Sequence, residues 1–151
     1  MKTVIPLIAQ LSEAETAAWL AALKPALPAC TFVLATDLSA AQRATVEVAI
    51  VANPDPADLW ALPRLRWVQS LWAGVERLVA ETAEAEFAIV KMSDPQLTAT
   101  MAEAVLAWTL YLHRDMPRYQ AQQKAQIWQQ HCLPLPSQRT IGLLGLGDLG
   151  T

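Results

Sequence analysis

The sequence predicts an α/β protein built around a parallel β-sheet. Three observations lead to this prediction: short apolar segments of strand type alternate with helical segments, two helical segments open with capping boxes, and a glycine-rich loop directly follows the last strand-like run. Strands that alternate with helices are joined by crossovers, which favour a parallel arrangement. The length of 151 residues suits one domain, or one domain and part of a second.

The composition excludes several classes of protein. Apolar residues make up 54% of the chain and charged residues 17%, so a buried core is expected rather than disorder. The net charge of −3 and the absence of a lysine or arginine cluster argue against nucleic-acid binding. No run approaches the roughly 18–20 apolar residues of a membrane span, and the apolar N-terminal run is too short for a signal peptide. We therefore expect a cytoplasmic protein that binds neither nucleic acid nor membrane.

The two cysteines give no sign of a disulfide framework or a metal site. Cys30 and Cys132 lie about a hundred residues apart in the sequence and have no metal-binding spacing. We expect two thiols in a reducing compartment and no bound metal.

The first strand and the first helix have clear sequence signals. Thr3–Ala9 is an apolar run that contains β-branched residues, which predicts a buried strand. Ser12 and Glu15 have the spacing of a capping box, so a helix is expected to begin there, with its apolar side packed on the core. We expect this helix to end before Pro25.

Two more strands follow, with a short helix between them. Residues 30–35 predict the second strand, and a second capping box, Ser39 with Gln42, predicts the helix. Residues 46–52 predict the third strand, and the Asn-Pro-Asp-Pro run at 53–56 predicts a loop.

The middle of the chain changes from strands to long helices. Residues 67–71 and 86–91 predict the fourth and fifth strands. Residues 101–112 are apolar almost all round, which predicts a long helix covered on both sides, between two domains or two subunits. Pro117 suits the first turn of a further helix or a kink, and residues 118–128 are glutamine-rich and expected to be solvated.

A domain boundary is expected in the proline-containing linker at residues 131–138. We expect a first domain at residues 1–98, interdomain helices at 99–130, and the start of a dinucleotide-binding domain at 139–151.

The glycine-rich loop carries the main chemical signal. Four of the five glycines fall in the last ten residues, and three of them, Gly145, Gly147 and Gly150, have the spacing G-x-G-x-x-G after a predicted strand at 139–144. Such glycines permit a tight turn, a close approach of the backbone to a pyrophosphate, and close packing of the following helix. The alternative is that these glycines serve ordinary turns. Both NADP and NAD fit the loop, because the residue that selects between them lies about 20 positions further on.

Three sequence blocks together resemble the D-isomer-specific 2-hydroxyacid dehydrogenases, and in particular their glyoxylate/hydroxypyruvate reductase branch. They occupy residues 65–76, residues 101–108 running into 113–119, and residues 140–150. The resemblance implies a two-domain enzyme that reduces a small 2-oxo acid with NADPH or NADH, with NADPH favoured. It also implies a flavodoxin-like substrate domain, a Rossmann-type nucleotide domain, and a homodimer formed through the interdomain helix region.

The resemblance also assigns candidate site residues. Backbone N–H groups of the loop at Trp72, Ala73 and Gly74 would hold the substrate carboxylate; the alternative for Gly74 is an ordinary turn between strand and helix. Trp72 replaces a small residue and Glu76 replaces the usual aspartate. The cofactor contacts would be Met101, otherwise a core methionine, and the loop residues Gly145, Gly147, Asp148, Leu149 and Gly150.

No catalytic residue of the family matches a position in this chain. The family uses an arginine, a histidine and an orienting carboxylate, all after the glycine-rich loop, and neither His113 nor His131 matches them. We expect His113 to be structural and the chain alone to be inactive in hydride transfer. Two alternatives stay open: a non-catalytic interaction module that pairs through the helix at 101–112, and a small nucleotide-binding regulator.

Overall fold

The computed structural model describes residues 2–147, 149 and 150 of the chain. It contains two compact units, Met1–Met92 and Ser93–Thr151. Asp148, one of the predicted cofactor contacts, lies outside the described residues. None of the helices in the described part of the chain is long and apolar enough to cross a membrane.

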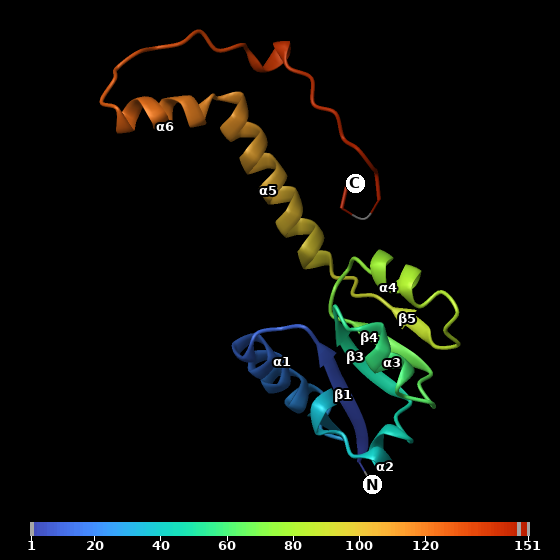
Figure 1. Ribbon diagram of the computed structural model, residues 1–151. Coiled ribbons are helices and arrows are strands. Elements are labelled where there is room, and N and C mark those ends of the chain that lie inside the picture. Colours follow the sequence, from blue (N-terminus) through green and yellow to red (C-terminus); the bar gives the residue numbers. More distant parts are fainter. Residues whose placement is uncertain (1, 148, 151) are drawn as a thin grey trace. The chain divides into compact units, whose positions relative to one another are not determined.

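The first unit contains a five-stranded parallel sheet in the order β2-β1-β3-β4-β5 (Figure 1). This confirms the predicted α/β fold with a parallel sheet. The strands are β1 Thr3–Ala9, β2 Cys30–Leu34, β3 Val48–Ala52, β4 Trp67–Ser70 and β5 Ala88–Val90. The last strand is shorter than the predicted 86–91, because it pairs with β4 over three residues only.

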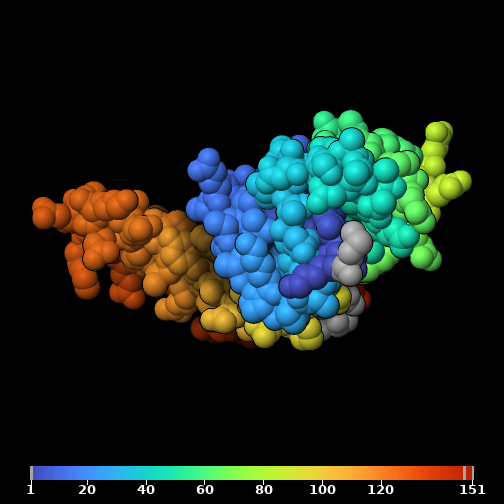
Figure 2. Space-filling view, turned by 90° about the horizontal axis from the view of Figure 1, so that it is seen from below, coloured from blue at the N-terminus to red at the C-terminus, as the bar shows by residue number. Residues whose placement is uncertain are grey.

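Helices cover both faces of this sheet. On one face, α1 (Glu13–Ala26) packs Trp19, Leu20 and Leu23 against a core cluster that contains Phe32 and Ile50. On the other face, α3 (Pro56–Trp60) and α4 (Glu76–Glu81) contribute Leu59 and Leu78 to a second cluster. Figure 2 shows the blue, cyan and green segments of this unit packed against one another. Burial on both faces is what the near-continuous apolar strands require.

Both predicted capping boxes are present. The N–H of Glu15 donates to the Ser12 hydroxyl at 3.3 Å, and the N–H of Ser12 donates to the Glu15 carboxylate at 2.9 Å. Ser39 and Gln42 make the equivalent pair of bonds at 3.2 and 2.9 Å at the start of α2, Ala40–Arg43. These bonds satisfy backbone donors that a helix N-terminus leaves without partners.

The prediction that the first helix ends before Pro25 is wrong by two residues. Helix α1 continues to Ala26, with Pro25 in its last turn. Proline removes one N–H donor there, but the N–H of Leu27 still donates to the Leu23 carbonyl at 3.0 Å. A single lost bond in a terminal turn is tolerated more readily than one in the helix interior.

The second unit begins with two helices. Helix α5 (Pro95–His113) starts six residues before the predicted segment, because Asp94 caps it by accepting a hydrogen bond from the N–H of Gln96 at 2.9 Å. Helix α6 (Met116–Lys124) has Pro117 in its first turn, as predicted, and ends four residues before the predicted position 128. A single 3₁₀ turn, η2 (Pro136–Gln138), follows in the proline-containing linker.

The predicted strand at residues 139–144 is not formed among the described residues. A strand needs a neighbour for its backbone N–H and C=O groups, and none of the five strands of the sheet pairs with this segment. Ile141, Leu143 and Leu144 are accordingly exposed. The apolar pattern that predicted the strand is present, but it lacks the pairing partner that would complete it.

Candidate functional site

A small cavity lies where β3 and β4 end, at the carboxyl edge of the parallel sheet. This is the edge at which open α/β sheets bind their ligands. The cavity has a volume of about 90 Å³, which exceeds the roughly 10–15 Å³ of such volume that one water molecule needs. Its lining residues are Asn53, Pro54, Ser70, Trp72, Gly74, Val75, Glu76, Arg77 and Leu78.

The loop that follows β4 is anchored by backbone hydrogen bonds at its start. The N–H of Leu71 donates to the Val51 carbonyl at 2.9 Å, which extends the pairing of β4 with β3 by one bond. The carbonyl of Trp72 accepts from the N–H of Met92 at 3.2 Å. Ser70 makes two further bonds to Trp72, so the backbone of the loop is held through Trp72.

The two residues that follow have unused backbone donors. Within residues 2–147, 149 and 150, the N–H groups of Ala73 and Gly74 have no hydrogen-bond acceptor. Adjacent, unengaged N–H groups of this kind can bind the oxygens of an anion. The predicted substrate residues Trp72, Ala73 and Gly74 therefore lie in one loop, but only the last two have free donors.

Gly74 leaves room at the mouth of the cavity. A Cβ atom at this position would meet only the Oε2 atom of Glu76, at 3.2 Å. Since that atom is the end of a flexible side chain, the fold itself does not require glycine here. The space is available to a ligand that approaches the backbone closely.

Trp72 is half-buried and packs against the core cluster on the α1 face of the sheet. Its indole Nε1 is buried and has no acceptor in the described part of the chain. A buried N–H without a partner is unusual and costs free energy. Trp72 is also one of the residues that line the cavity.

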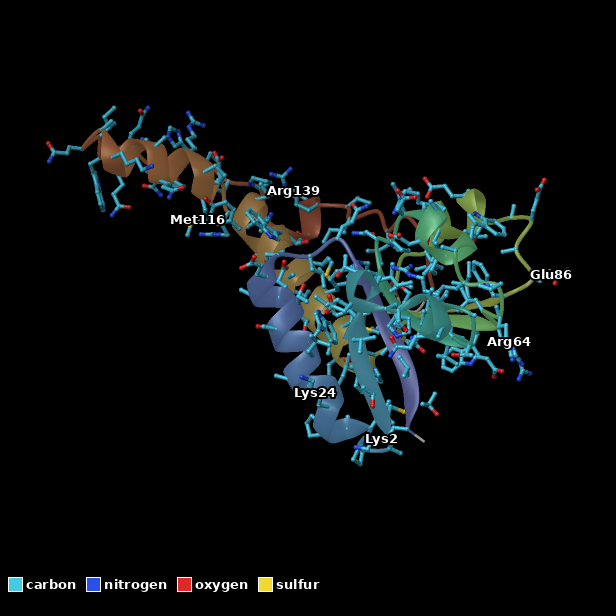
Figure 3. All side chains as sticks on the ribbon, turned by 60° about the horizontal axis from the view of Figure 1, so that its bottom comes forward. Lys2, Lys24, Arg64, Glu86, Met116 and Arg139 are labelled. Atoms are coloured by element: carbon cyan, nitrogen blue, oxygen red, sulfur yellow. The ribbon has the colours of Figure 1, made fainter. Side chains whose placement is uncertain are left out.

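Charges of both signs line the cavity. Arg77 donates to the Pro54 carbonyl at 3.3 Å and pairs with Glu81 at 2.8 Å, while the Glu76 carboxylate lies beside Gly74. Elsewhere in the first unit the labelled Lys2, Lys24, Arg64 and Glu86 lie at separate places on the periphery (Figure 3).

Several lining residues were not predicted from the sequence, among them Asn53 and Ser70. Asn53, directly after β3, has a left-handed backbone with φ of 48°, a conformation that asparagine adopts more readily than most residues. The signal for it was the Asn-Pro pair at the end of the strand, which predicted only a loop. Ser70 carried no signal, because a serine at the end of an apolar strand has many uses.

The glycine-rich loop lies in the second unit. Gly145 has a φ of 96°, which side chains of other residues rarely allow, and a Cβ on Gly150 would collide with the Gly145 carbonyl. The N–H of Gly150 donates to the Gly147 carbonyl at 2.9 Å. Two of the three motif glycines thus have a geometric reason to be glycine. Leu149 is exposed beside them, and Met101 is exposed on α5.

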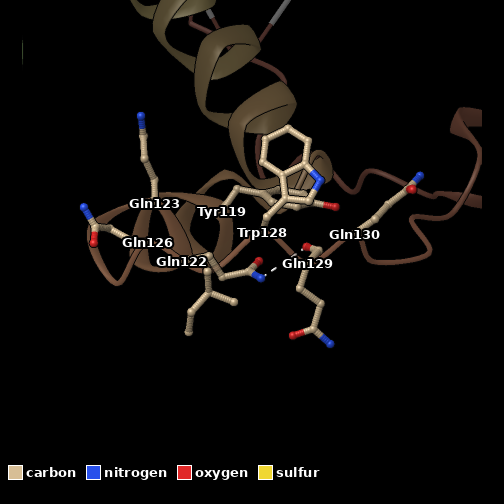
Figure 4. Close-up of a pocket in the computed structure, with 8 residues that line it drawn as sticks. Tyr119, Gln122, Gln123, Gln126, Trp128, Gln129 and Gln130 are labelled. Atoms are coloured by element: carbon tan, nitrogen blue, oxygen red, sulfur yellow. Dashed lines mark hydrogen bonds between the residues drawn. The ribbon is translucent and has the colours of Figure 1, made fainter.

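A larger hollow in the second unit, of about 560 Å³, is formed where the chain turns back after α6 (Figure 4). The Gln122 side chain closes this turn by donating to the Gln129 carbonyl at 3.1 Å, and His131 contacts Gln122 at 2.9 Å. Its lining residues are Tyr119, Gln122, Gln123, Gln126, Ile127, Trp128, Gln129 and Gln130. These side chains carry no charge at neutral pH, so this hollow offers little acid–base chemistry.

The histidines and acidic residues assemble no further centre in the part of the chain that the structure describes. Neither ring nitrogen of His113 has a hydrogen-bond partner there, although both are buried at the end of α5. Among the same residues, no group of three histidine, cysteine, aspartate or glutamate side chains could hold a metal ion.

Comparison with known proteins extends these observations. No family model matches the chain. Glyoxylate/hydroxypyruvate reductase A from Yersinia enterocolitica is 31% identical over 146 residues, which cover 90% of this chain and 44% of that protein.

Solved structures with the same fold are also found. A D-isomer specific 2-hydroxyacid dehydrogenase from Xanthobacter autotrophicus in complex with NADPH and MES superposes with a TM-score of 0.81 and 26% identity, covering 99% of this chain and 48% of that one. An NADPH-dependent glyoxylate/hydroxypyruvate reductase from Sinorhizobium meliloti in complex with NADP and sulfate superposes with a TM-score of 0.82 and 26% identity. The match covers 99% of this chain and 47% of that one.

In sequence and in fold the chain is therefore similar to D-isomer specific 2-hydroxyacid dehydrogenases, and the predicted resemblance to them is confirmed. Within this class it is similar to glyoxylate/hydroxypyruvate reductase A. The chain spans about half the length of the relatives it matches.

Proposed function

We propose that this chain is the substrate-binding part, with the start of the nucleotide-binding part, of an NAD(P)H-dependent reductase. Its substrate would be a small 2-oxo acid of the glyoxylate or hydroxypyruvate class, which is reduced to the 2-hydroxy acid. The domains would be those expected from the sequence: residues 1–98, 99–130 and 139–151. The two free cysteines, Cys30 and Cys132, are consistent with the cytoplasm as its location.

One observation carries the substrate assignment: the adjacent, unengaged N–H groups of Ala73 and Gly74, in a loop whose residues Trp72 and Gly74 line a cavity of about 90 Å³. A carboxylate has two oxygens that can accept from such a pair. The cavity volume is compatible with a small acid. The similarity to glyoxylate/hydroxypyruvate reductases supports the same substrate class.

The cofactor would be held by the glycine-rich loop of the second unit. The left-handed backbone at Gly145 and the close packing of Gly150 on it fit a tight loop around a pyrophosphate, with Gly147 at the point of closest approach. Leu149, Asp148 and Met101 would complete the contacts. NADPH is the favoured form, since two similar structures hold NADPH or NADP. Such a cofactor supplies the hydride when it is bound.

The chain alone would not transfer hydride, because none of its residues matches the arginine and histidine that the family uses. The test follows NADPH absorbance in the presence of glyoxylate and the purified 151-residue chain. We expect no turnover above the rate without protein. Measurable turnover would show that the chain carries its own catalytic groups.

The alternative is a non-catalytic module that dimerises through α5. Its support is the row of large apolar side chains that α5 exposes, among them Leu106 and Trp108 at 64% and 63% exposure. Exposed apolar patches of this kind commonly mark interaction sites. Sedimentation analysis of the chain discriminates: a dimer supports the module, and a well-folded monomer at all concentrations argues against it.

A further inference from the structure

We propose that Ser70 is a positioning residue, which determines the backbone N–H groups that the loop after β4 presents to a ligand. In this assignment Ser70 engages the N–H of Trp72 and thereby leaves the pair at Ala73 and Gly74 as the anion-binding donors. The inference rests on the proposed function, since it concerns the same site.

The geometry of Ser70 supports this role. Ser70 is a residue of only 4% exposure, at the last position of β4. The hydroxyl accepts from the N–H of Trp72 at 3.0 Å and donates to the carbonyl of the same residue, also at 3.0 Å. A hydroxyl has one donor and two acceptor sites, so both backbone groups of Trp72 are satisfied by one side chain. The backbone is thereby turned within two residues of the strand end.

The backbone carbonyl and the backbone N–H of Trp72 differ in their further hydrogen bonds. Its carbonyl also accepts from the N–H of Met92 at 3.2 Å, whereas its N–H has no other partner within residues 2–147, 149 and 150. Removal of the Ser70 hydroxyl would therefore leave the carbonyl anchored and the N–H free. The peptide plane before Trp72 could then rotate, and the start of the loop that carries the two donors would be held less firmly.

This arrangement implies a ligand with two acceptor oxygens in one plane. A carboxylate fits adjacent donors at Ala73 and Gly74, and the missing Cβ of Gly74 lets the group approach the backbone. Groups that bind a ligand are usually held in position by buried neighbouring residues, which are themselves fixed by packing and hydrogen bonds.

The experiment compares the wild-type chain with Ser70→Ala and with Thr82→Val as a matched control. Thr82 is also 4% exposed as a residue, and its hydroxyl also donates to a backbone carbonyl, that of Leu78 at 2.7 Å, but Thr82 does not line the cavity. Two readouts are taken by nuclear magnetic resonance: the hydrogen-exchange rate of the Trp72 amide, and the shifts of the Ala73 and Gly74 amides on titration with sodium glyoxylate. Sodium chloride at the same ionic strength gives the baseline.

We expect glyoxylate to shift the two amides in the wild type. In Ser70→Ala, Trp72 exchange should rise and the Kd for glyoxylate should increase about tenfold, equivalent to about 1.4 kcal/mol. Thr82→Val should change neither. If Ser70→Ala does not fold, Ser70→Cys takes its place with the same expectation, since a thiol is a weak hydrogen-bonding group of similar size.

The outcomes separate the two proposals. A wild-type chain whose Ala73 and Gly74 amides do not respond to glyoxylate overturns the proposed function. A wild type that binds, with a Ser70 variant that binds equally well, overturns the positioning role alone, whatever the exchange rate of Trp72. Weaker binding in both the Ser70 and the Thr82 variants also overturns it, because a general loss of stability would then explain the effect.

Discussion

Ser70 and Trp72 exchange two hydrogen bonds of 3.0 Å, in which one buried hydroxyl satisfies both backbone groups of the residue two positions later. The bonds turn the chain sharply where β4 ends. Because Trp72 is engaged in this way, the next two N–H groups are the first in the loop that a ligand can use.

Gly74→Ala should weaken anion binding without unfolding the chain. The added Cβ would meet only the flexible carboxylate of Glu76, so the free energy of unfolding should change by less than about 1 kcal/mol. The same methyl group would occupy the space through which a carboxylate reaches the backbone, and the Kd for glyoxylate should rise about tenfold. Gly142→Ala is the control, since a Cβ there meets nothing within 4 Å. Equal affinity in Gly74→Ala and the wild type would contradict the site.

Glu76→Gln should strengthen anion binding. The Glu76 carboxylate lies beside Gly74 and repels a second negative charge there. Two unit charges about 4 Å apart in water interact by about 1 kcal/mol, so removal of one should tighten binding about fivefold at low salt, and less at high salt. Glu84→Gln removes an exposed charge that does not line the cavity and serves as the control. If both variants bind alike, the anion does not sit next to Glu76.

Trp72→Phe should leave the chain as stable as the wild type or more stable, by about 1 kcal/mol. The change removes an indole N–H that is buried without an acceptor among the described residues, and such a group destabilises a folded protein. Urea denaturation of the two proteins measures the difference. Trp128→Phe is the control: Trp128 is fully exposed, so this variant shows the effect on stability of replacing a tryptophan that is not buried. A clear loss of stability in Trp72→Phe would mean that the packing of the indole outweighs its unpaired N–H.

The capping box at Ser12 should make part of the stability pH-dependent. The hydrogen bond from the Ser12 side chain, and then the one from its backbone, lower the pKa of the Glu15 carboxyl. A carboxyl with a lowered pKa in the folded state stabilises the fold at neutral pH, and this contribution is lost as the pH falls through the folded-state pKa. Ser12→Ala should therefore destabilise the chain at pH 7 and have a smaller effect at acidic pH. Denaturation curves at both pH values test this, with Glu15→Gln expected to show the same loss of pH dependence.

The sequence was most informative where a local rule decides the structure. The capping boxes at Ser12 and Ser39 depend on residues three positions apart, and both formed as predicted. The parallel sheet was also predictable, because apolar strands that alternate with helices have few other ways to bury both faces.

The sequence was less informative where the local structure depends on residues that are distant in the chain or on the backbone geometry. Residues 139–144 have the pattern of a strand but, among the described residues, no neighbouring strand to pair with. Pro25 is a different, local case, since one lost hydrogen bond is tolerated in the last turn of α1. The roles of Ser70 and Asn53 needed the backbone geometry, since neither the hydrogen bonds of Ser70 nor the positive φ of Asn53 follows from residue type. The predicted contacts at Met101 and in the glycine-rich loop stay predictions.

The central claim is that the Ala73 and Gly74 N–H groups bind the carboxylate of a small 2-oxo acid. A crystal structure of the 151-residue chain grown with glyoxylate tests this claim most directly. We expect the two carboxylate oxygens about 3 Å from the backbone nitrogens of Ala73 and Gly74, with the Trp72 N–H still bonded to Ser70. Glyoxylate bound elsewhere, with both N–H groups left to water, would contradict the account.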